Sequence, residues 1–274
     1  MKKNKSVLLS VPYSIWMVVF TLIPLGVVAY YALTDPETGT FTWSNLLEVG
    51  TYLPVFGQSI LYSLVSALIC LLLGYPVAYH IAHRGPVAQK LLYMLVMLPM
   101  CMSFLLRTLA WVGLLQDTGI INNFLDAIGI GRLKLIRTPG AVILGMVYNY
   151  LPYMILPLYS IIVKIDHRLI EAAEDLGCTP TQTFRKVVLP LSTPGIVSGI
   201  TMVFVPAVST FYISQKLGGA GTVLIGDIIE RMYKQGNNAN LGAALSLLLM
   251  ILVLVCTGIM NKLTGSDGED VVIV

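Results

Sequence analysis

The chain has 274 residues, of which 56% are hydrophobic and only 11% are charged, and its mean hydropathy is +0.81. A soluble domain needs roughly 25% charged residues to solvate its surface, so much of this surface must face something other than water. The formal net charge of +3 is too small to indicate nucleic acid, and the scattered cysteines and histidines predict neither a disulfide framework nor a metal site.

Six apolar runs are long enough to cross a membrane, which takes about 20 residues per helix. They lie at 12–34, 57–82, 90–115, 140–163, 190–212 and 241–261. The sequence therefore predicts an all-α integral membrane protein with six transmembrane helices in a single domain, 1–274. Its core is expected at about 57–262, and the run at 12–34 is too long for a signal peptide and is expected to be a retained extra helix.

The Lys and Arg residues between these runs predict the orientation. With the N-terminus inside, about ten lie in the inner segments and six in the outer ones. Because positive charges gather on the cytoplasmic side, N-in and C-in is the expected topology. The six outer cations are Arg132, Lys134, Arg137, Lys216, Arg231 and Lys234.

Arg107 is the one charge that falls well inside an expected span. A cation at that depth costs roughly 2.5–3.5 kcal/mol on insertion scales, so it should be paired. Carbonyl groups freed by Pro99 or Pro152, or a partner subunit, are the expected partners.

The segment 164–190, between the fourth and fifth runs, is far more charged than the rest of the chain. Asp166 can cap a helix that Gly177 ends, because glycine adopts positive φ at little cost. Thr179 or Thr181 can cap a second helix with Phe184 on its apolar face. The pattern predicts two short amphipathic helices that meet at a glycine on the inner membrane surface. From the pattern alone, an interfacial helix pair without a partner is an alternative.

The spacing in this segment resembles the EAA loop of type I ABC importer permeases, EAA-x3-G-x9-I-x-LP, with valine at the isoleucine position. In that family this segment is the coupling helix, which inserts into a cleft of a cytoplasmic ATPase. The resemblance implies that Glu171 is a polar contact, that the two alanines allow close approach and that the glycine forms the turn. The residues it assigns to coupling are Glu171, Ala172, Ala173, Gly177, Leu189 and Pro190.

Nearly the whole chain resembles the spermidine/putrescine permeases within that family. The resemblance is carried by Leu73-Gly74-Tyr75-Pro76-Val77-Ala78, by Leu151-Pro152-Tyr153-Met154 and by Phe211-Tyr212-Ile213-Ser214, among other stretches. It implies polyamine import by alternating access. At one point the chain departs from the pattern, because Gln215-Lys216 stands where these permeases tend to place an acid.

A polyamine path needs aromatic faces and carboxylates, and each cation–π contact contributes on the order of 0.5–2 kcal/mol. The candidate path residues are Tyr148, Phe211, Tyr212, Gln215, Asp227 and Glu230. Ordinary packing and interfacial aromatic belts are the alternative explanation for the tyrosines.

The sequence contains no G-x-x-x-x-G-K-[ST] phosphate loop, so the chain is expected not to be an enzyme and to have no cofactor of its own. The resemblance implies that ATP and Mg²⁺ bind a partner ATPase present in two copies. It also implies a second permease, an extracytoplasmic binding protein and a location in the bacterial cytoplasmic membrane. An importer of another solute (ferric iron, thiamine or an opine-like compound) and a secondary transporter are the alternatives.

Overall fold

The computed structural model describes residues 3–35, 38–234 and 238–263. This part of the chain is almost entirely helical, and its β pairing is an isolated bridge between Thr34 and Phe41. The chain divides into two compact units, one of residues 1–54 with 228–252 and the other of residues 55–227 with 253–274.

The first unit contains α1 (Lys3–Ala32), α2 (Ser44–Glu48), the 3-10 helix η1 (Val49–Tyr52), most of α13 (Ile225–Lys234) and the first half of α14 (Ala239–Leu263). Two buried asparagines converge on Thr34, two residues after the end of α1. The Nδ2 groups of Asn45 and Asn240 donate to the Thr34 carbonyl oxygen over 2.9 and 2.6 Å. These hydrogen bonds tie the end of α1 to α2 and to the start of α14.

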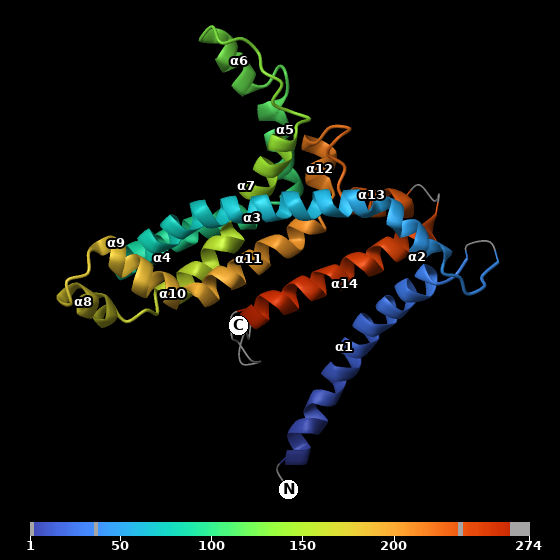
Figure 1. The fold of residues 1–274 in the computed structure, drawn as a ribbon, viewed down its shortest axis with the longest axis horizontal. Coiled ribbons are helices and arrows are strands. Elements are labelled where there is room, and N and C mark those ends of the chain that lie inside the picture. The colour runs from blue at the N-terminus through green and yellow to red at the C-terminus, as the bar shows by residue number, and fades with distance from the viewer. Residues whose placement is uncertain (1–2, 36–37, 235–237, 264–274) are drawn as a thin grey trace. The chain divides into compact units, whose positions relative to one another are not determined.

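The second unit holds the remaining helices, and Figure 1 labels most of them. They are α3 (Leu53–Ala82), α4 (Pro86–Met97), the 3-10 helix η2 (Leu98–Cys101), α5 (Phe104–Leu115), α6 (Ile120–Ala127), α7 (Pro139–Ile162), α8 (His167–Asp175), α9 (Pro180–Thr183), the π-helical turn η3 (Phe184–Val188), α10 (Leu189–Leu191), α11 (Thr193–Val208) and α12 (Tyr212–Leu217).

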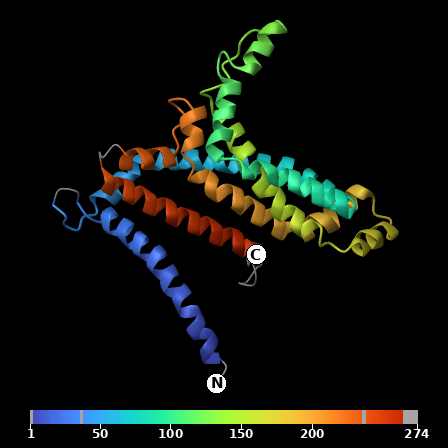
Figure 2. The same cartoon turned by 180° about the vertical axis from the view of Figure 1, so that it is seen from behind.

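The core of the second unit is built on α7, which is the most buried of the apolar helices, and α11 lies beside it in both ribbon views (Figures 1 and 2). Two glycines of α11, four residues apart, allow the close approach. A Cβ at Gly195 would lie 3.1 Å from the Pro157 carbonyl oxygen, and one at Gly199 would lie 2.6 Å from the Met154 sulfur. This is the small-residue packing by which membrane helices bring their backbones together.

In the described part of the chain, five helices are long and apolar enough to cross a membrane: Ile15–Ala32, Ser44–Ala82, Phe104–Ala127, Pro139–Ile162 and Ala239–Lys262. A sixth is formed if the bent pair Pro180–Leu191 and Thr193–Val208 counts as one span. The predicted all-α fold with six spans is therefore confirmed, whereas the ends of several spans differ from the prediction. The first helix begins at Lys3 rather than near residue 12.

The predicted third span, 90–115, is not one helix. The helix α4 passes into η2, and α5 begins only at Phe104. Pro99 has no N–H to continue the helical hydrogen bonds, and Met102 and Ser103 are extended, with ψ of 147° and 129°. A break of two extended residues inside an apolar run does not alter hydropathy, so the sequence did not reveal it.

The predicted fifth span, 190–212, is also divided. The helical axis bends by 63° between Pro180–Leu191 and α11, with Ser192 at the bend. The helix α11 ends at Val208, and Phe211 precedes the separate helix α12. Phe211 and Tyr212 therefore lie in and after a turn rather than at the end of the spanning helix.

Candidate functional site: the coupling segment and the aromatic face

The segment assigned to coupling follows directly from α7. After α7 ends at Ile162, α8 begins at His167, and the Asp166 side chain accepts a hydrogen bond from the Arg168 N–H at 3.0 Å. The predicted N-cap is confirmed. Since α7 has 24 residues and rises about 36 Å, this segment and the residues before Pro139 lie at opposite ends of a membrane-spanning helix.

Gly177 ends α8 with a φ of +81°, as the sequence predicted. Its N–H donates to the Glu174 carbonyl at 2.8 Å, and the Cys178 N–H donates to the Ala173 carbonyl at 3.0 Å. These two bonds form a Schellman motif, which satisfies carbonyls at the end of the helix. A Cβ at Gly177 would meet nothing within 4 Å, so the backbone conformation and not the available space requires glycine here.

The second half of the segment begins with a capping box. The Thr179 hydroxyl accepts from the Gln182 N–H, while the Gln182 side chain accepts from the Thr179 N–H at 3.0 Å. Thr179, rather than Thr181, is therefore the cap. The single second helix of the prediction is instead a succession of α9, η3 and α10.

Aromatic contacts attach this half to α3. The Phe184 ring meets Tyr75 edge-on at a centroid distance of 5.5 Å and Tyr79 at 5.7 Å. The Tyr75 hydroxyl is hydrogen-bonded to the Ser192 hydroxyl at 2.8 Å, and both residues are buried. The bend that precedes α11 is thus held directly against α3.

The two alanines of the EAA motif face different ways. Ala173 is buried, whereas Ala172 is exposed, together with Leu169 and Leu176, whose exposed fractions are 47% and 86%. Because residues 169, 172 and 176 share one face of a helix, they form an outward apolar stripe, which we call the α8 stripe. The resemblance assigned one role to both alanines, but only Ala172 lies on this stripe.

The other residues assigned to coupling are accessible. The Glu171 side chain is 66% exposed and lies 3.6 Å from the His167 ring nitrogen. Leu189 and Pro190 are exposed just before the bend at Ser192. The structure therefore places an acid beside the α8 stripe, and the Leu-Pro pair at the joint between this segment and α11.

Four aromatic side chains of the second unit form a continuous row. Ring centroids are 6.3 Å apart for Tyr153 and Tyr150, 6.4 Å for Tyr150 and Phe104, and 6.3 Å for Phe104 and Tyr212. We call these four residues the aromatic row. Of the predicted path residues only Tyr212 belongs to it.

The aromatic row was missed in the sequence because its members come from three helices. Tyr150 and Tyr153 are three residues apart on α7, which is the local signal that could have paired them. Tyr148 points to a different neighbour, the Trp111 ring, at 5.4 Å. Phe211 is 40% exposed and lies next to Tyr212 in the turn before α12.

The two predicted acids have local partners. Asp227 is buried in the first turn of α13, and its Oδ2 accepts from the Leu224 N–H at 3.0 Å. Glu230 forms an ion pair with Lys234, one turn further along the helix. The carboxylate of Asp227 therefore stabilises the start of α13, and that of Glu230 is partly neutralised by Lys234.

Gln215 is exposed and lines a pocket of about 850 Å³ together with cationic side chains, one of which is Lys216. The Lys216 ammonium group lies 5.7 Å from the centroid of the Tyr212 ring. One aromatic face of the predicted path is thus already occupied by a cation of this chain.

Arg107 is buried on α5, with an exposed fraction of 5%. Its Nε and Nη1 atoms have no hydrogen-bond partner among the described residues, and neither does Oδ1 of the buried Asn149. The expected hydrogen bonds to carbonyl groups freed by Pro99 or Pro152 are therefore not made by these two nitrogens.

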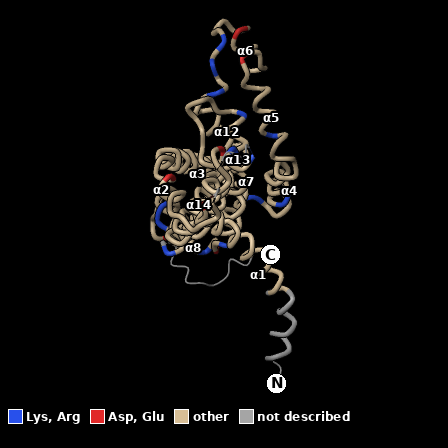
Figure 3. Tube along the Cα trace, turned by 90° about the vertical axis from the view of Figure 1, so that its right-hand side faces the viewer, with Lys and Arg blue, Asp and Glu red and all other residues tan. Residues whose placement is uncertain are grey.

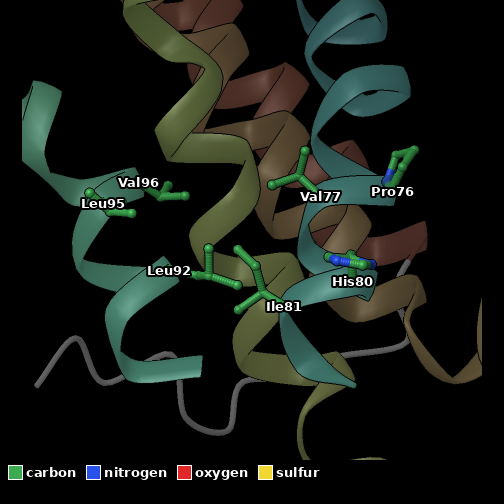
Figure 4. Close-up of a pocket in the computed structure, with 7 residues that line it drawn as sticks. All are labelled: Pro76, Val77, His80, Ile81, Leu92, Leu95 and Val96. Atoms are coloured by element: carbon green, nitrogen blue, oxygen red, sulfur yellow. The ribbon is translucent and has the colours of Figure 1, made fainter. Parts of the chain in front are cut away.

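A pocket of about 530 Å³ lies between α3 and α4 (Figure 4). Its lining consists of apolar side chains and His80, so it offers a cationic solute no carboxylate. Among the described residues, no group of three or more His, Cys, Asp or Glu side chains is placed to hold a metal ion.

Comparisons with known proteins agree with this architecture. Residues 70–264 match the family described as binding-protein-dependent transport system inner membrane component. The chain is 39% identical to the spermidine/putrescine transport system permease protein PotB of Haemophilus influenzae, over 87% of this chain and 86% of that protein. It is 36% identical to PotB of Escherichia coli K12, over 87% and 90% of the two chains.

Solved structures show the same fold at low sequence identity. A chain of a bacterial ABC transporter involved in the import of the acidic polysaccharide alginate superposes with a TM-score of 0.81 at 19% identity, over 97% of this chain and 98% of that one. A chain of the inward-facing MetNI methionine ABC transporter gives 0.59 at 20% identity, over 78% and 94%. The match to residues 70–264 and the two relatives that are 39% and 36% identical show that this chain belongs to the family of binding-protein-dependent transport system inner membrane components.

Proposed function

We propose that this chain is the membrane-spanning permease subunit of an ATP-driven importer that takes up the polyamines spermidine and putrescine. The observation that carries the proposal is the identity of 39% and 36% to two spermidine/putrescine permeases over 87% of the chain. The exposed coupling segment at one end of α7 supports the ATP-driven part, because it offers a rigid surface to a protein that moves.

The α8 stripe and Glu171 are the proposed contact with the ATPase. An apolar helix face that is exposed to water gains free energy when a groove covers it. Ala172 leaves room for close approach, while Ala173 packs inward and holds α8 in place. Movement of the ATPase is then transmitted through Phe184 and Ser192 to α3 and α11, because both residues are in direct contact with Tyr75 of α3.

The proposed partners are two copies of a cytoplasmic ATPase, which bind ATP and Mg²⁺, a second permease and an extracytoplasmic binding protein. A solved alginate ABC transporter is in complex with a substrate-bound periplasmic protein, which supports a binding protein here. The chain itself is proposed to be non-catalytic and to lie in the cytoplasmic membrane with both termini inside.

The aromatic row is the proposed surface for the cationic cargo, with Tyr153 exposed, Phe104 and Tyr212 half-buried, and Tyr150 buried. Tyrosine and phenylalanine faces attract ammonium groups weakly enough to release them, at about 0.5–2 kcal/mol each. Phe211 extends this surface, since it is exposed beside Tyr212. Tyr148 remains a candidate on another face of α7, where it packs against Trp111. Arg107 is excluded as a cargo contact because it would repel a polycation.

Uptake of radiolabelled spermidine and putrescine tests the proposal in cells with and without the chain. Loss of both uptakes on deletion is the expected result, and unchanged uptake would remove the polyamine assignment. Gly177→Pro tests coupling, because proline cannot adopt a φ of +81° and removes the N–H bonded to Glu174. This variant should reach the membrane without supporting uptake.

Gly85→Pro is the matched control. Gly85 has a φ of −63° and ψ of 157°, which proline adopts freely, and a Cβ there would meet no neighbour within 4 Å. Normal uptake by Gly177→Pro would contradict the coupling role. Equal loss in both variants would show that proline acts through membrane insertion instead.

A further inference from the structure

The pocket of about 850 Å³ that Gln215 lines has a lining dominated by positive charge. Four cations contribute to it, Arg132, Lys134, Arg137 and Lys216, against one carboxylate, Asp117. Lys and Arg lie along the chain near α6 in Figure 3. Arg132 also lies 3.5 Å from Asp126, but both side chains are more than half exposed, so this surface ion pair contributes little.

The position of these cations runs against the usual distribution. The pocket precedes α7 and the coupling segment follows it, so the proposed topology puts the pocket outside the cell. Positive charge is disfavoured on that side of the membrane. Four of the six outer Lys and Arg residues line this one pocket. The charge preference that sets membrane topology does not explain why these cations gather in one pocket on the outer side.

One buried side chain and two close backbone contacts hold the walls of the pocket in place. Asn122 is fully buried, and its side chain bonds the Leu133 N–H and carbonyl at 2.9 Å each. Arg137 adopts a φ of +60°, and its N–H donates to the Leu217 carbonyl at 2.9 Å. A Cβ at Gly219 would lie 2.7 Å from the Arg137 carbonyl oxygen, so only glycine fits at this position.

A preformed cationic pocket cannot be the entrance for a polycation, because each approaching amine would meet like charge. It fits an anionic partner instead. The binding protein of the proposed importer must meet this chain on the outer side, and a surface of it that carries carboxylates would be complementary in charge to the pocket. We propose that this pocket receives a carboxylate-bearing surface of the extracytoplasmic binding protein. The inference rests on the proposed function and adds the place of docking.

Docking there has a consequence for delivery. The partner's carboxylates neutralise the pocket while the binding protein is seated, so cargo released nearby meets less repulsion. After the partner leaves, the exposed cations oppose the return of the polyamine. Gln215, which lines the pocket, belongs to this docking surface rather than to the cargo path.

The test uses the complete transporter in phosphatidylcholine vesicles, with ATP hydrolysis measured as the spermidine-loaded binding protein of the same bacterium is added. Arg132→Glu/Lys134→Glu reverses two pocket charges and leaves the residues assigned to cargo and coupling intact. Half-maximal stimulation should need on the order of tenfold more binding protein, with unchanged basal hydrolysis. The difference should shrink at high salt, because screening weakens both repulsion and attraction.

Arg231→Glu is the matched control, since it makes the same charge change at an exposed outer cation of α13 that is not part of the pocket lining. It should behave like the wild type. An unchanged half-maximal concentration in the double variant would overturn the docking site, while stimulation of the wild type would still support the proposed function. A defect seen only with phosphatidylglycerol in the vesicles would assign the pocket to a lipid headgroup. A wild type that the binding protein does not stimulate would overturn the proposed function and this inference together.

Discussion

Arg107 is a charge buried at membrane depth with two nitrogens that have no hydrogen-bond partner in the described part of the chain. Leaving a buried charge unpaired costs several kcal/mol, so its partner should come from the assembled transporter. The neighbouring apolar residues of α5 are exposed, among them Leu105 at 49% and Leu106 at 62%. These two leucines point away from the core that buries Arg107, and they can contact lipid or a second permease.

Arg107→Met should destabilise the assembled complex by about 3–5 kcal/mol, because removing one member of a buried pair leaves the other unpaired. Size-exclusion chromatography after heating would show dissociation at a lower temperature than for the wild type. Leu106→Met, one residue away on the exposed face, is the control and should have little effect. A complex that is equally or more stable with Arg107→Met would mean that the charge has no partner in the assembly.

Glu230 and Asp35 are both acids of the first unit, but their surroundings differ. Glu230 is paired with Lys234, and Asp35 accepts from the Thr38 N–H at 3.0 Å, a bond that asparagine can also make. If Glu230 attracts cargo, Glu230→Gln should raise the KM for spermidine uptake several-fold, whereas Asp35→Asn should leave it unchanged. Equal effects of the two substitutions, or none from either, would remove Glu230 from the path.

The contact between η3 and α3 decides whether force from the coupling segment reaches the spans. Phe184→Ala removes both edge-on ring contacts, with Tyr75 and Tyr79, each worth about 0.5–1.5 kcal/mol. ATP hydrolysis by the reconstituted transporter should then continue while spermidine transport falls at least several-fold. Phe124→Ala on α6, where the side chain is 64% exposed, is the control for loss of a phenyl ring. Equal ratios of transport to hydrolysis in both variants would disprove this route.

Packing between α7 and α11 depends on space and not on backbone conformation. Gly195→Ala/Gly199→Ala would force the two helices apart against the Pro157 carbonyl and Met154, and overpacking of this kind costs about 1–3 kcal/mol. The variant should unfold at a lower temperature in a thermal-shift assay. Gly57→Ala on α3, where a Cβ meets nothing within 4 Å, should be neutral. A double variant as stable as the control would show that α7 and α11 can accommodate both methyl groups without strain.

The features that the sequence predicted well are determined by residues that lie close to them in the chain. The Asp166 cap, the positive φ at Gly177 and a cap at Thr179 depend on short-range hydrogen bonds that residue types reveal. The π-helical turn Phe184–Val188 and the bend at Ser192 contact α3, more than 100 residues earlier, for example through the Tyr75–Ser192 bond. Such long-range contacts leave no local pattern.

The cargo surface was harder to predict for the same reason. Hydropathy identifies α7 as a span but does not say which of its tyrosines share a face with α5 and α12. The sequence favoured Tyr148, whereas Tyr150 and Tyr153 join Phe104 and Tyr212 in the structure. The cationic pocket could not be predicted from the sequence either, because its four cations come from two separate segments of the chain.

At the scale of the whole molecule, the chain divides into two compact units, so the predicted single-domain organisation stays a prediction. The second unit alone contains the coupling segment, the aromatic row and the cationic pocket. The family match, which begins at residue 70, covers nearly all of that unit and leaves out α1. Removing α1 should therefore test whether coupling and docking need this helix of the first unit.

The glycine contacts between α7 and α11 also bear on what an importer must do while it is idle. The cell's membrane potential drives protons and Na⁺ inward with about 2.3 kcal/mol per 100 mV for each charge. Because the Pro157 carbonyl and Gly195 approach too closely for a side chain to lie between them, we expect this contact to act as a seal against water and ions between the two helices. A larger residue at either glycine would loosen this electrical seal, and the first sign in the cell would be a leak of membrane potential, even before polyamine uptake declined.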